Sequence, residues 1–201
     1  MPLREFPKQV QLQDGTAVTL RPMVRDDRDA LLDFFRRLSP EDRQFLKDDV
    51  ARPEIVEAWI RDLDYDRVLP ILAIHEERIV GDATLHRQPH GWMRHVGEIR
   101  LATDPFFRRR GLATVLAREI FYLALQAGLD KMVAEIAADQ VAALKVFGRL
   151  GFQQEARLAG QIVDLHGRKH DLVILTTDIP ALMAKMQETF YRAAGSGYQD
   201  D

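Results

Sequence analysis

One short stretch near the middle of the chain has the residue types of an anion-binding site. It reads Arg108-Arg109-Arg110-Gly111-Leu112-Ala113 and follows a strand-like run from Val96 to Thr103. The apolar residues after it predict a buried helix, and the first N–H groups of a helix lack intrahelical acceptors and carry partial positive charge. Gly111 and Ala113 leave room for a large anion, and the arginines add fixed charge. The pattern therefore indicates a phosphate or diphosphate site.

The elements that must position this loop follow from apolar periodicity and turn signals. The expected strands span 10–12, 18–20, 69–74, 79–85, 96–103, 132–137, 152–158 and 171–175. The expected helices begin at Asp26, Ser39, Pro53, Arg109 and Asp139, where Asp26, Ser39 and Asp139 are caps, and a last helix runs from Ile179 to about Tyr191. This order predicts an α/β fold with a mixed sheet and helices on both faces. Residues 1–178 are expected to form the domain, and residues 179–201 a C-terminal helix and loose tail.

Composition limits the class of protein. The chain has 201 residues, 46% of them apolar and 29% charged, which is typical of one globular domain. The formal net charge of -3 predicts no nucleic-acid partner, because such partners require a basic surface. The absence of cysteine excludes disulfides, thiolate nucleophiles and cysteine-ligated zinc. No apolar run reaches membrane-spanning length and no apolar leader stands at the N-terminus, so we expect a cytoplasmic protein without membrane contact.

A second segment, DQVAALKVFGRLGF at 139–152, adds context to the arginine loop. The two together resemble the acetyl-CoA-binding segments of the GCN5-related N-acetyltransferase (GNAT) family. Further likeness lies at 14–22 and 38–41, which resemble GNAT domains of bacterial protein-lysine acetyltransferases, and at 79–83, which resembles the strand before the cofactor strand. The resemblance covers about residues 10–177.

The resemblance implies a fold, a cosubstrate and a set of contacts. The fold would be a mixed sheet splayed open between the fourth and fifth strands, with acetyl-CoA in the opening. Backbone groups of Leu101, Ala102 and Thr103 would bind the pantetheine arm. The loop would bind the diphosphate through the residues Arg108, Arg109, Arg110, Gly111, Leu112, Ala113 and Thr114. Gln140 takes the usual asparagine place and Phe147 the usual tyrosine place near the thioester, although phenylalanine cannot protonate the departing thiolate.

Glu98 is the catalytic candidate, because its position matches the catalytic glutamate of the bacterial lysine-acetyltransferase branch. Strand alternation puts its side chain on the same face as Arg100 and Ala102. Partial burial there is expected to raise its pKa and suit it as a general base, directly or through water. The alternatives are a charge merely paired with Arg100 or a neighbouring strand, and His86 or His95 as the base. The histidine spacings match no zinc pattern, so no metal is expected.

These observations lead to a functional hypothesis. The chain would be an acetyl-CoA-dependent N-acyltransferase whose acceptor is a primary amine, on a small molecule or as a protein lysine or N-terminus, attacking the thioester directly. The alternative is a non-catalytic CoA-binding regulatory module of the same fold, suggested by Phe147. A nucleotide-binding enzyme fits poorly, because the chain lacks both the Gly-x-x-x-x-Gly-Lys-Ser/Thr loop and Gly-x-Gly-x-x-Gly. The acceptor, the thiolate's proton donor and the oligomeric state, a homodimer included, stay open.

Overall fold

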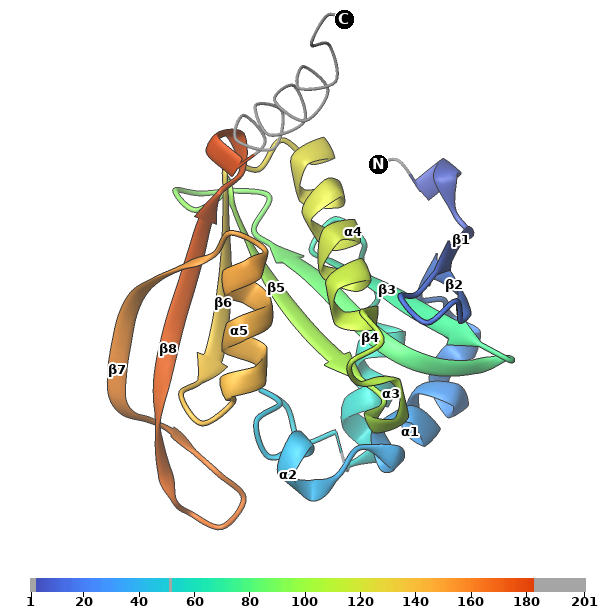
Figure 1. Cartoon of the computed structure of the whole chain (residues 1–201), viewed down its shortest axis with the longest axis horizontal. Coiled ribbons are helices and arrows are strands. Elements are labelled where there is room, and N and C mark those ends of the chain that lie inside the picture. Colours follow the sequence, from blue (N-terminus) through green and yellow to red (C-terminus); the bar gives the residue numbers. More distant parts are fainter. Residues whose placement is uncertain (1–2, 51, 183–201) are drawn as a thin grey trace, which may run out of the picture.

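The computed structural model describes residues 3–50 and 52–182 (Figure 1). Residues 179–182 begin the predicted C-terminal helix, and the Asp178 side chain accepts a hydrogen bond from the Ala181 N–H at 2.7 Å. The rest of that helix and the predicted tail lie outside the described residues. No helix in the described ranges is long and apolar enough to cross a bilayer.

An eight-stranded mixed sheet forms the centre of the described structure. Its strands are β1 (Lys8–Gln11), β2 (Ala17–Pro22), β3 (Val68–His75), β4 (Arg78–Arg87), β5 (Val96–Thr103), β6 (Lys131–Ala137), β7 (Gln153–Val163) and β8 (Lys169–Asp178). They lie in the order β1-β2-β3-β4-β5-β6-β8-β7, and every neighbouring pair is antiparallel except β5 and β6. The predicted mixed sheet is confirmed, and β7 and β8 are longer than expected.

The parallel pair β5 and β6 separates soon after it starts. The two strands are in register only from Val96 opposite Lys131 to Glu98 opposite Val133, although β5 continues to Thr103 and β6 to Ala137. The sheet therefore opens between its fifth and sixth strands, one position later along this chain than the resemblance implied. Beyond Glu98, the edge of β5 that faces β6 has no strand partner.

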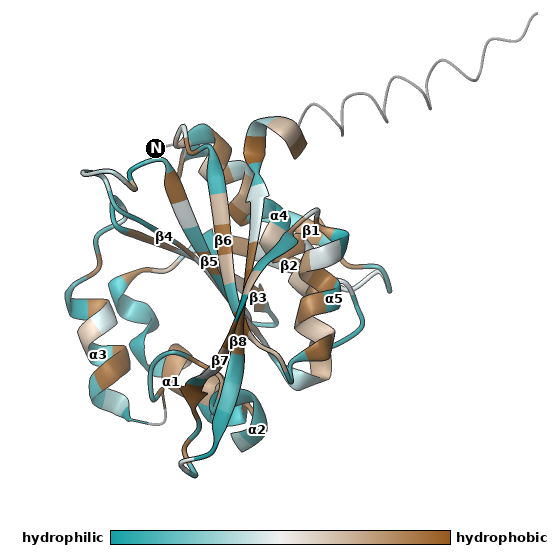
Figure 2. Ribbon diagram, turned by 90° about the vertical axis from the view of Figure 1, so that its left-hand side faces the viewer, coloured by the Kyte–Doolittle hydropathy of each residue, from teal (hydrophilic) through white to brown (hydrophobic). Residues whose placement is uncertain are grey.

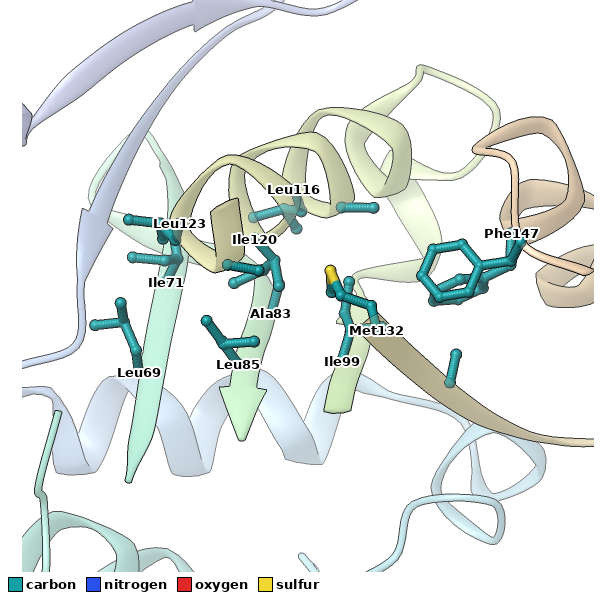
Figure 3. Close-up of a cluster of buried hydrophobic side chains, with 14 of the residues drawn as sticks. Leu69, Ile71, Ala83, Leu85, Ile99, Leu116, Ile120, Leu123, Met132 and Phe147 are labelled. Atoms are coloured by element: carbon teal, nitrogen blue, oxygen red, sulfur yellow. The ribbon is translucent and has the colours of Figure 1, made fainter. Parts of the chain in front are cut away.

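Helices cover both faces of the sheet, as predicted (Figure 2). They are α1 (Arg28–Arg37), α2 (Pro40–Arg43), α3 (Pro53–Arg61), α4 (Leu112–Gln126) and α5 (Val141–Arg149), with 3₁₀ turns at Leu3–Glu5, Arg25–Asp27 and Pro105–Phe107. On one face, Leu116, Ile120 and Leu123 of α4 point at apolar side chains of β3, β4 and β5 (Figure 3). On the other face, Phe34 and Phe35 of α1 belong to a separate buried cluster.

Of the three cap residues predicted from the sequence, the structure confirms one, at α2, and differs at α1 and α5. The Ser39 hydroxyl accepts the Asp42 N–H at 3.2 Å and caps α2, as expected. Asp26 does not cap α1, because Asp27 precedes that helix and its carboxylate instead accepts from Arg21 and from the Val24 N–H. Asp139 does not cap α5 either: Gln140 holds the cap position.

Gly81 of β4 sets how closely α4 approaches the sheet. A Cβ there would lie 2.7 Å from Leu116 Cδ1 and 3.3 Å from Leu112 Cδ2, both in the first turns of α4. We predict that Gly81→Ala lowers the free energy of unfolding by about 1–3 kcal/mol through overpacking, as measured by urea denaturation. Gly148→Ala is the control, because a Cβ at Gly148 meets no heavy atom within 4 Å. This substitution should raise the free energy of unfolding by about 0.4–1 kcal/mol. Equal stability of Gly81→Ala and the wild type would contradict this packing.

Candidate active site

The predicted anion loop is a tight turn that leads into α4, which begins at Leu112. Gly111 is at the N-cap of α4 with φ +87°, and Arg109 also has a positive φ of 59°. The first N–H of the helix to find an acceptor is that of Val115, which bonds to the Gly111 carbonyl at 3.0 Å. The N–H groups of Leu112, Ala113 and Thr114 have no acceptor among the described residues. This is the bare helix start that an anion requires.

The three arginines of the loop differ in what they contact. Arg108 pairs with Asp42 of α2. Arg110 lies 3.3 Å from Asp14 of the β1–β2 turn, and its guanidinium stacks 5.1 Å from the centre of the Phe107 ring. Arg109 is exposed and has no ion pair or hydrogen bond with any residue that the structure describes. Two of the arginines therefore fix the loop to neighbouring segments, and the Arg109 side chain keeps its donors for a ligand.

A cavity of about 610 Å³ lies between the sheet and the helices α1 and α3. Its apolar wall includes Met23, Phe35 and Trp59. Its polar floor comes from strands on both sides of the sheet opening: Asp82, Thr84 and His86 of β4, Glu98 and Arg100 of β5, and Glu135 of β6. The cavity thus reaches the point where β5 and β6 separate, which suits a second substrate approaching from this face.

Glu98 lies in this floor with two cations beside it. Its carboxylate accepts hydrogen bonds from Lys47 Nζ at 2.6 Å and from Arg100 Nε at 2.9 Å. Burial by itself would raise the pKa of Glu98, but the hydrogen bonds and charges of Arg100 and Lys47 outweigh burial and hold that pKa below its usual value. The raised pKa expected for Glu98 is therefore wrong, and the pairing with Arg100, which was the alternative interpretation, is present. At neutral pH the carboxylate is ionised.

Lys47 is a site residue that sequence reasoning missed. It belongs to the segment between α2 and α3, and its ammonium lies 2.6 Å from Glu98 of β5 and 2.6 Å from Glu135 of β6. One ammonium thus bridges the two strands where their pairing ends. A single lysine in an irregular segment has no periodicity or motif, so the sequence offers no signal for this contact.

The two histidines weighed as alternative bases differ in position. His86 lies opposite Glu98 in the β4–β5 register, lines the cavity, and its Nε2 is 3.0 Å from Thr84 Oγ1. Burial, with a contribution from the Arg100 charge, lowers the pKa of His86 to about 4. His86 is therefore neutral at neutral pH and a weak base. His95 is exposed just before β5 and does not line the cavity.

Asp82 is the second polar residue that the sequence did not single out. It lines the cavity from β4, opposite Ala102 of β5, and its Oδ1 has no hydrogen-bond partner among the described residues. Burial raises the pKa of Asp82 to about 7. A carboxyl group that titrates near neutrality inside a cavity is a frequent feature of functional sites.

The remaining predicted contact residues lie around the opening. Leu101 and Ala102 line the cavity, and Thr103 pairs with Gly81 at the end of β5. Gln140 stands at the start of α5. Phe147 is buried in the core with its ring 5.1 Å from that of Phe152, edge to face, so its packing accounts for its apolar side chain. The contacts of these residues with acetyl-CoA stay a prediction.

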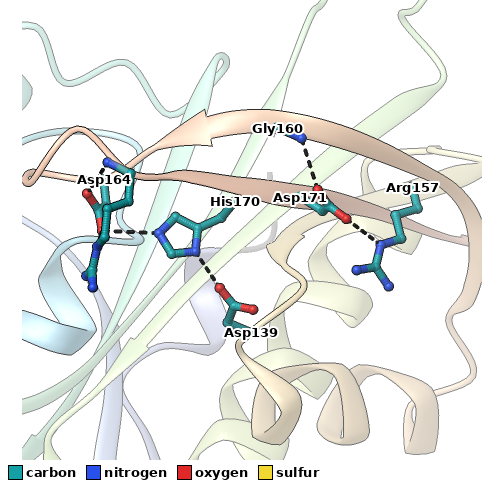
Figure 4. A network of polar contacts seen from close by, with 7 residues as sticks. Asp139, Arg157, Gly160, Asp164, His170 and Asp171 are labelled. Atoms are coloured by element: carbon teal, nitrogen blue, oxygen red, sulfur yellow. Dashed lines mark hydrogen bonds and ion pairs between the residues drawn. The ribbon is translucent and has the colours of Figure 1, made fainter.

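A polar network fixes the β7–β8 hairpin beside the start of α5 (Figure 4). His170 contacts Asp139 through Nδ1 and lies 3.1 Å from Asp164 through Nε2, and Arg168 donates to Asp164 at 2.7 Å. The hydrogen bonds to Asp164 and Asp139 raise the pKa of His170. The His170 ring also contacts Phe45 of the segment that carries Lys47, at 5.4 Å between centres. The contact between Asp139 and His170 Nδ1 engages the carboxylate that would otherwise cap α5.

The raised pKa of Asp82 makes stability depend on pH. The folded pKa of about 7 exceeds the unfolded value of 3.8, so the folded state binds more protons between these values and stability falls as pH rises through that window. We predict that the free energy of unfolding of Asp82→Asn, relative to that of the wild type, increases by roughly 1–3 kcal/mol as the pH rises from 4 to 8, measured by urea denaturation at each pH. Solvent in the cavity limits the size of this effect. The control Asp26→Asn, on an exposed turn, should leave the pH dependence unchanged. Parallel curves for Asp82→Asn and the wild type would refute the assignment.

Comparison with known proteins agrees with this geometry. Residues 28–152, more than half of the chain, match the sequence model of the acetyltransferase (GNAT) family. N-alpha-acetyltransferase 30 of Xenopus laevis is 33% identical over 91 residues, which are 45% of this chain and 33% of that protein, so the match spans about a third of the relative's length. An acetyltransferase of Pseudomonas aeruginosa is 26% identical over 147 residues, covering 70% of this chain and 77% of that protein.

A solved structure supports the same fold. The YncA protein of Salmonella typhimurium, determined with its cofactor acetyl-CoA, matches with a TM-score of 0.70 at 19% identity, over 81% of this chain and 94% of that one. The likeness in structure, the opening between β5 and β6 and the family match over residues 28–152 lead to one conclusion. The chain belongs to the acetyltransferase (GNAT) family.

Proposed function

We propose that this protein transfers an acetyl group from acetyl-CoA to a primary amine, with Glu98 as the general base. The observation that carries the proposal is the position of the Glu98 carboxylate, which lies in the cavity floor at the last paired residue before β5 and β6 separate. A base at this point can reach an amine in the cavity while a thioester lies along the unpaired edge of β5.

The loop before α4 fits the coenzyme's diphosphate. Its bare N–H groups at Leu112, Ala113 and Thr114 and the uncommitted Arg109 supply donors and positive charge. Bound acetyl-CoA supplies the activated acetyl group, and the residues of the chain orient it and accept the acceptor's proton.

Proton removal is the step that needs help from the protein. An alkylammonium has a pKa of about 10.4, so making the neutral amine near pH 7 costs roughly 4–5 kcal/mol. Glu98 is ionised at that pH and can take the proton as the amine attacks. The departing thiol has a pKa of about 8.5, so the thiolate is a tolerable leaving group. Water in the open cavity can protonate the thiolate in place of the tyrosine hydroxyl that Phe147 lacks.

The acceptor is a primary amine, on a small molecule or at a polypeptide lysine or N-terminus. A cavity floor with Asp82, Glu98 and Glu135 favours a cationic acceptor over an acidic one. The Xenopus laevis relative is named an N-alpha-acetyltransferase, which supports including peptides with free N-termini in the acceptor panel.

Ala113 is the position best suited to a substitution that tests coenzyme binding. Gly111 is less suitable, because its φ of +87° strains any side chain and a Cβ would lie 3.1 Å from Gln13. Ala113→Asp places a carboxylate in the first turn of α4, which favours the helix by about 0.3–1 kcal/mol but repels a diphosphate. We predict at least about a tenfold loss of acetyl-CoA affinity in calorimetry with the fold intact. Ala113→Ser is the control for side-chain size. Normal acetyl-CoA affinity of Ala113→Asp would contradict diphosphate binding by this loop. NAD and ATP should bind neither variant.

Glu98→Gln tests the base. The glutamine keeps the shape but cannot accept the proton, so we predict about a hundredfold lower rate of thiol release near pH 7 with any amine found active in a screen. The rate should recover at high pH, where the amine is already neutral. Calorimetry with acetyl-CoA is the control, since binding should persist. An unchanged rate and pH profile would remove Glu98 as the base.

A further inference from the structure

The Lys47 ammonium stands where an acceptor amine would have to stand. Its Nζ lies 2.6 Å from the proposed base, Glu98, and 2.6 Å from Glu135 across the opening between β5 and β6. Glu98 and Val133 face each other in the last paired position, and Glu135 follows two residues along β6. The chain therefore holds one of its own primary amines between the strands that separate to admit the thioester.

Glu98 does not depend on this lysine alone for a cationic partner. Arg100 already neutralises Glu98 through a hydrogen bond of 2.9 Å, so Lys47 brings a second cation to the same carboxylate. About a third of the Lys47 side chain is exposed, and the segment between α2 and α3 that carries Lys47 lines the cavity. The ammonium is thus accessible from the cavity and chemically equivalent to the acceptor class proposed above.

We propose that Lys47 is a self-acetylation site: in the absence of an external amine, acetyl-CoA bound in the opening transfers its acetyl group to Lys47 Nζ. The proposal rests on the proposed function. Glu98 takes one proton from the ammonium, and the neutral nitrogen attacks the thioester carbonyl carbon. The N–C bond forms and the C–S bond breaks, the thiolate takes the second nitrogen proton and leaves as CoA thiol, and Glu98 returns its proton to water.

Acetylation of Lys47 would change the acceptor site. The product is an uncharged amide, so Glu98 would keep only Arg100 as a cationic partner and Glu135 would lose its partner in this pair. The charged and titratable groups then around Glu98 are Arg100 on its own strand, which also pairs with Asp48, His86 on β4 and Glu135 on β6. With one cation fewer, the pKa of Glu98 rises, and both carboxylates become available to an incoming ammonium.

The test uses the full chain, acetyl-CoA and no added amine, followed by peptide mass spectrometry. We expect acetylation of Lys47 at a rate independent of protein concentration, as an intramolecular reaction requires. The exposed Lys145 and Lys169 report uncatalysed acetylation in the same sample. Glu98→Gln should slow modification of Lys47 at least about tenfold and leave Lys145 and Lys169 unchanged. In Lys47→Arg, which keeps the charge, no other lysine should take over the rapid modification.

The outcomes separate this proposal from the proposed function. If the protein binds acetyl-CoA and acetylates an amine from the screen but leaves Lys47 at the level of Lys145, self-acetylation is overturned and the proposed function stands. A rate that rises with protein concentration also overturns it, because the reaction is then between molecules. If the protein neither releases thiol with any amine nor modifies Lys47, both proposals fall.

Discussion

The site depends on one parallel strand pair that stays together for only three residues. Antiparallel pairing continues on both sides, from β1 to β5 and from β6 through β8 to β7, so the sheet is held firmly except along this line. Where β5 and β6 separate, backbone on the edge of β5 loses its ladder partner and a space opens within the sheet. α4 starts beyond the far end of β5, which brings the bare helix N-terminus to the same opening.

Charges converge on this opening from three segments. Glu98 comes from β5, Glu135 from β6 and Lys47 from the connection between α2 and α3. The two carboxylates would repel each other across the gap without a cation between them, so the site is built to contain positive charge. In the resting protein Lys47 supplies it, and an acceptor ammonium has the same charge and hydrogen-bonding groups.

The sequence predicted the elements well and the side-chain contacts of the site poorly. Apolar periodicity identified the eight strands and the helices of the described residues, because burial sets that pattern locally, although α4 begins at Leu112 and not at Arg109 as expected. The raised pKa expected for Glu98 was wrong because the hydrogen bonds of Arg100 and Lys47 outweigh burial, and Lys47 lies 51 residues away in an irregular segment. The sequence predicted Asp139 as the cap of α5, but its carboxylate contacts His170, a residue distant in sequence. Asp82 carried no signal, since only the fold reveals that its Oδ1 has no partner.

The two apolar clusters described above lie on opposite faces of one sheet and do different work. The cluster under α4 holds the loop that we propose binds the coenzyme, which is the same molecule in every turnover, whereas the cluster under α1 and α3 supplies a wall of the cavity proposed for the acceptor. Side chains on the second face can therefore be exchanged by natural variation while the first face stays intact. A protein divided in this way can acquire a new acceptor without rebuilding the machinery that carries the acetyl group.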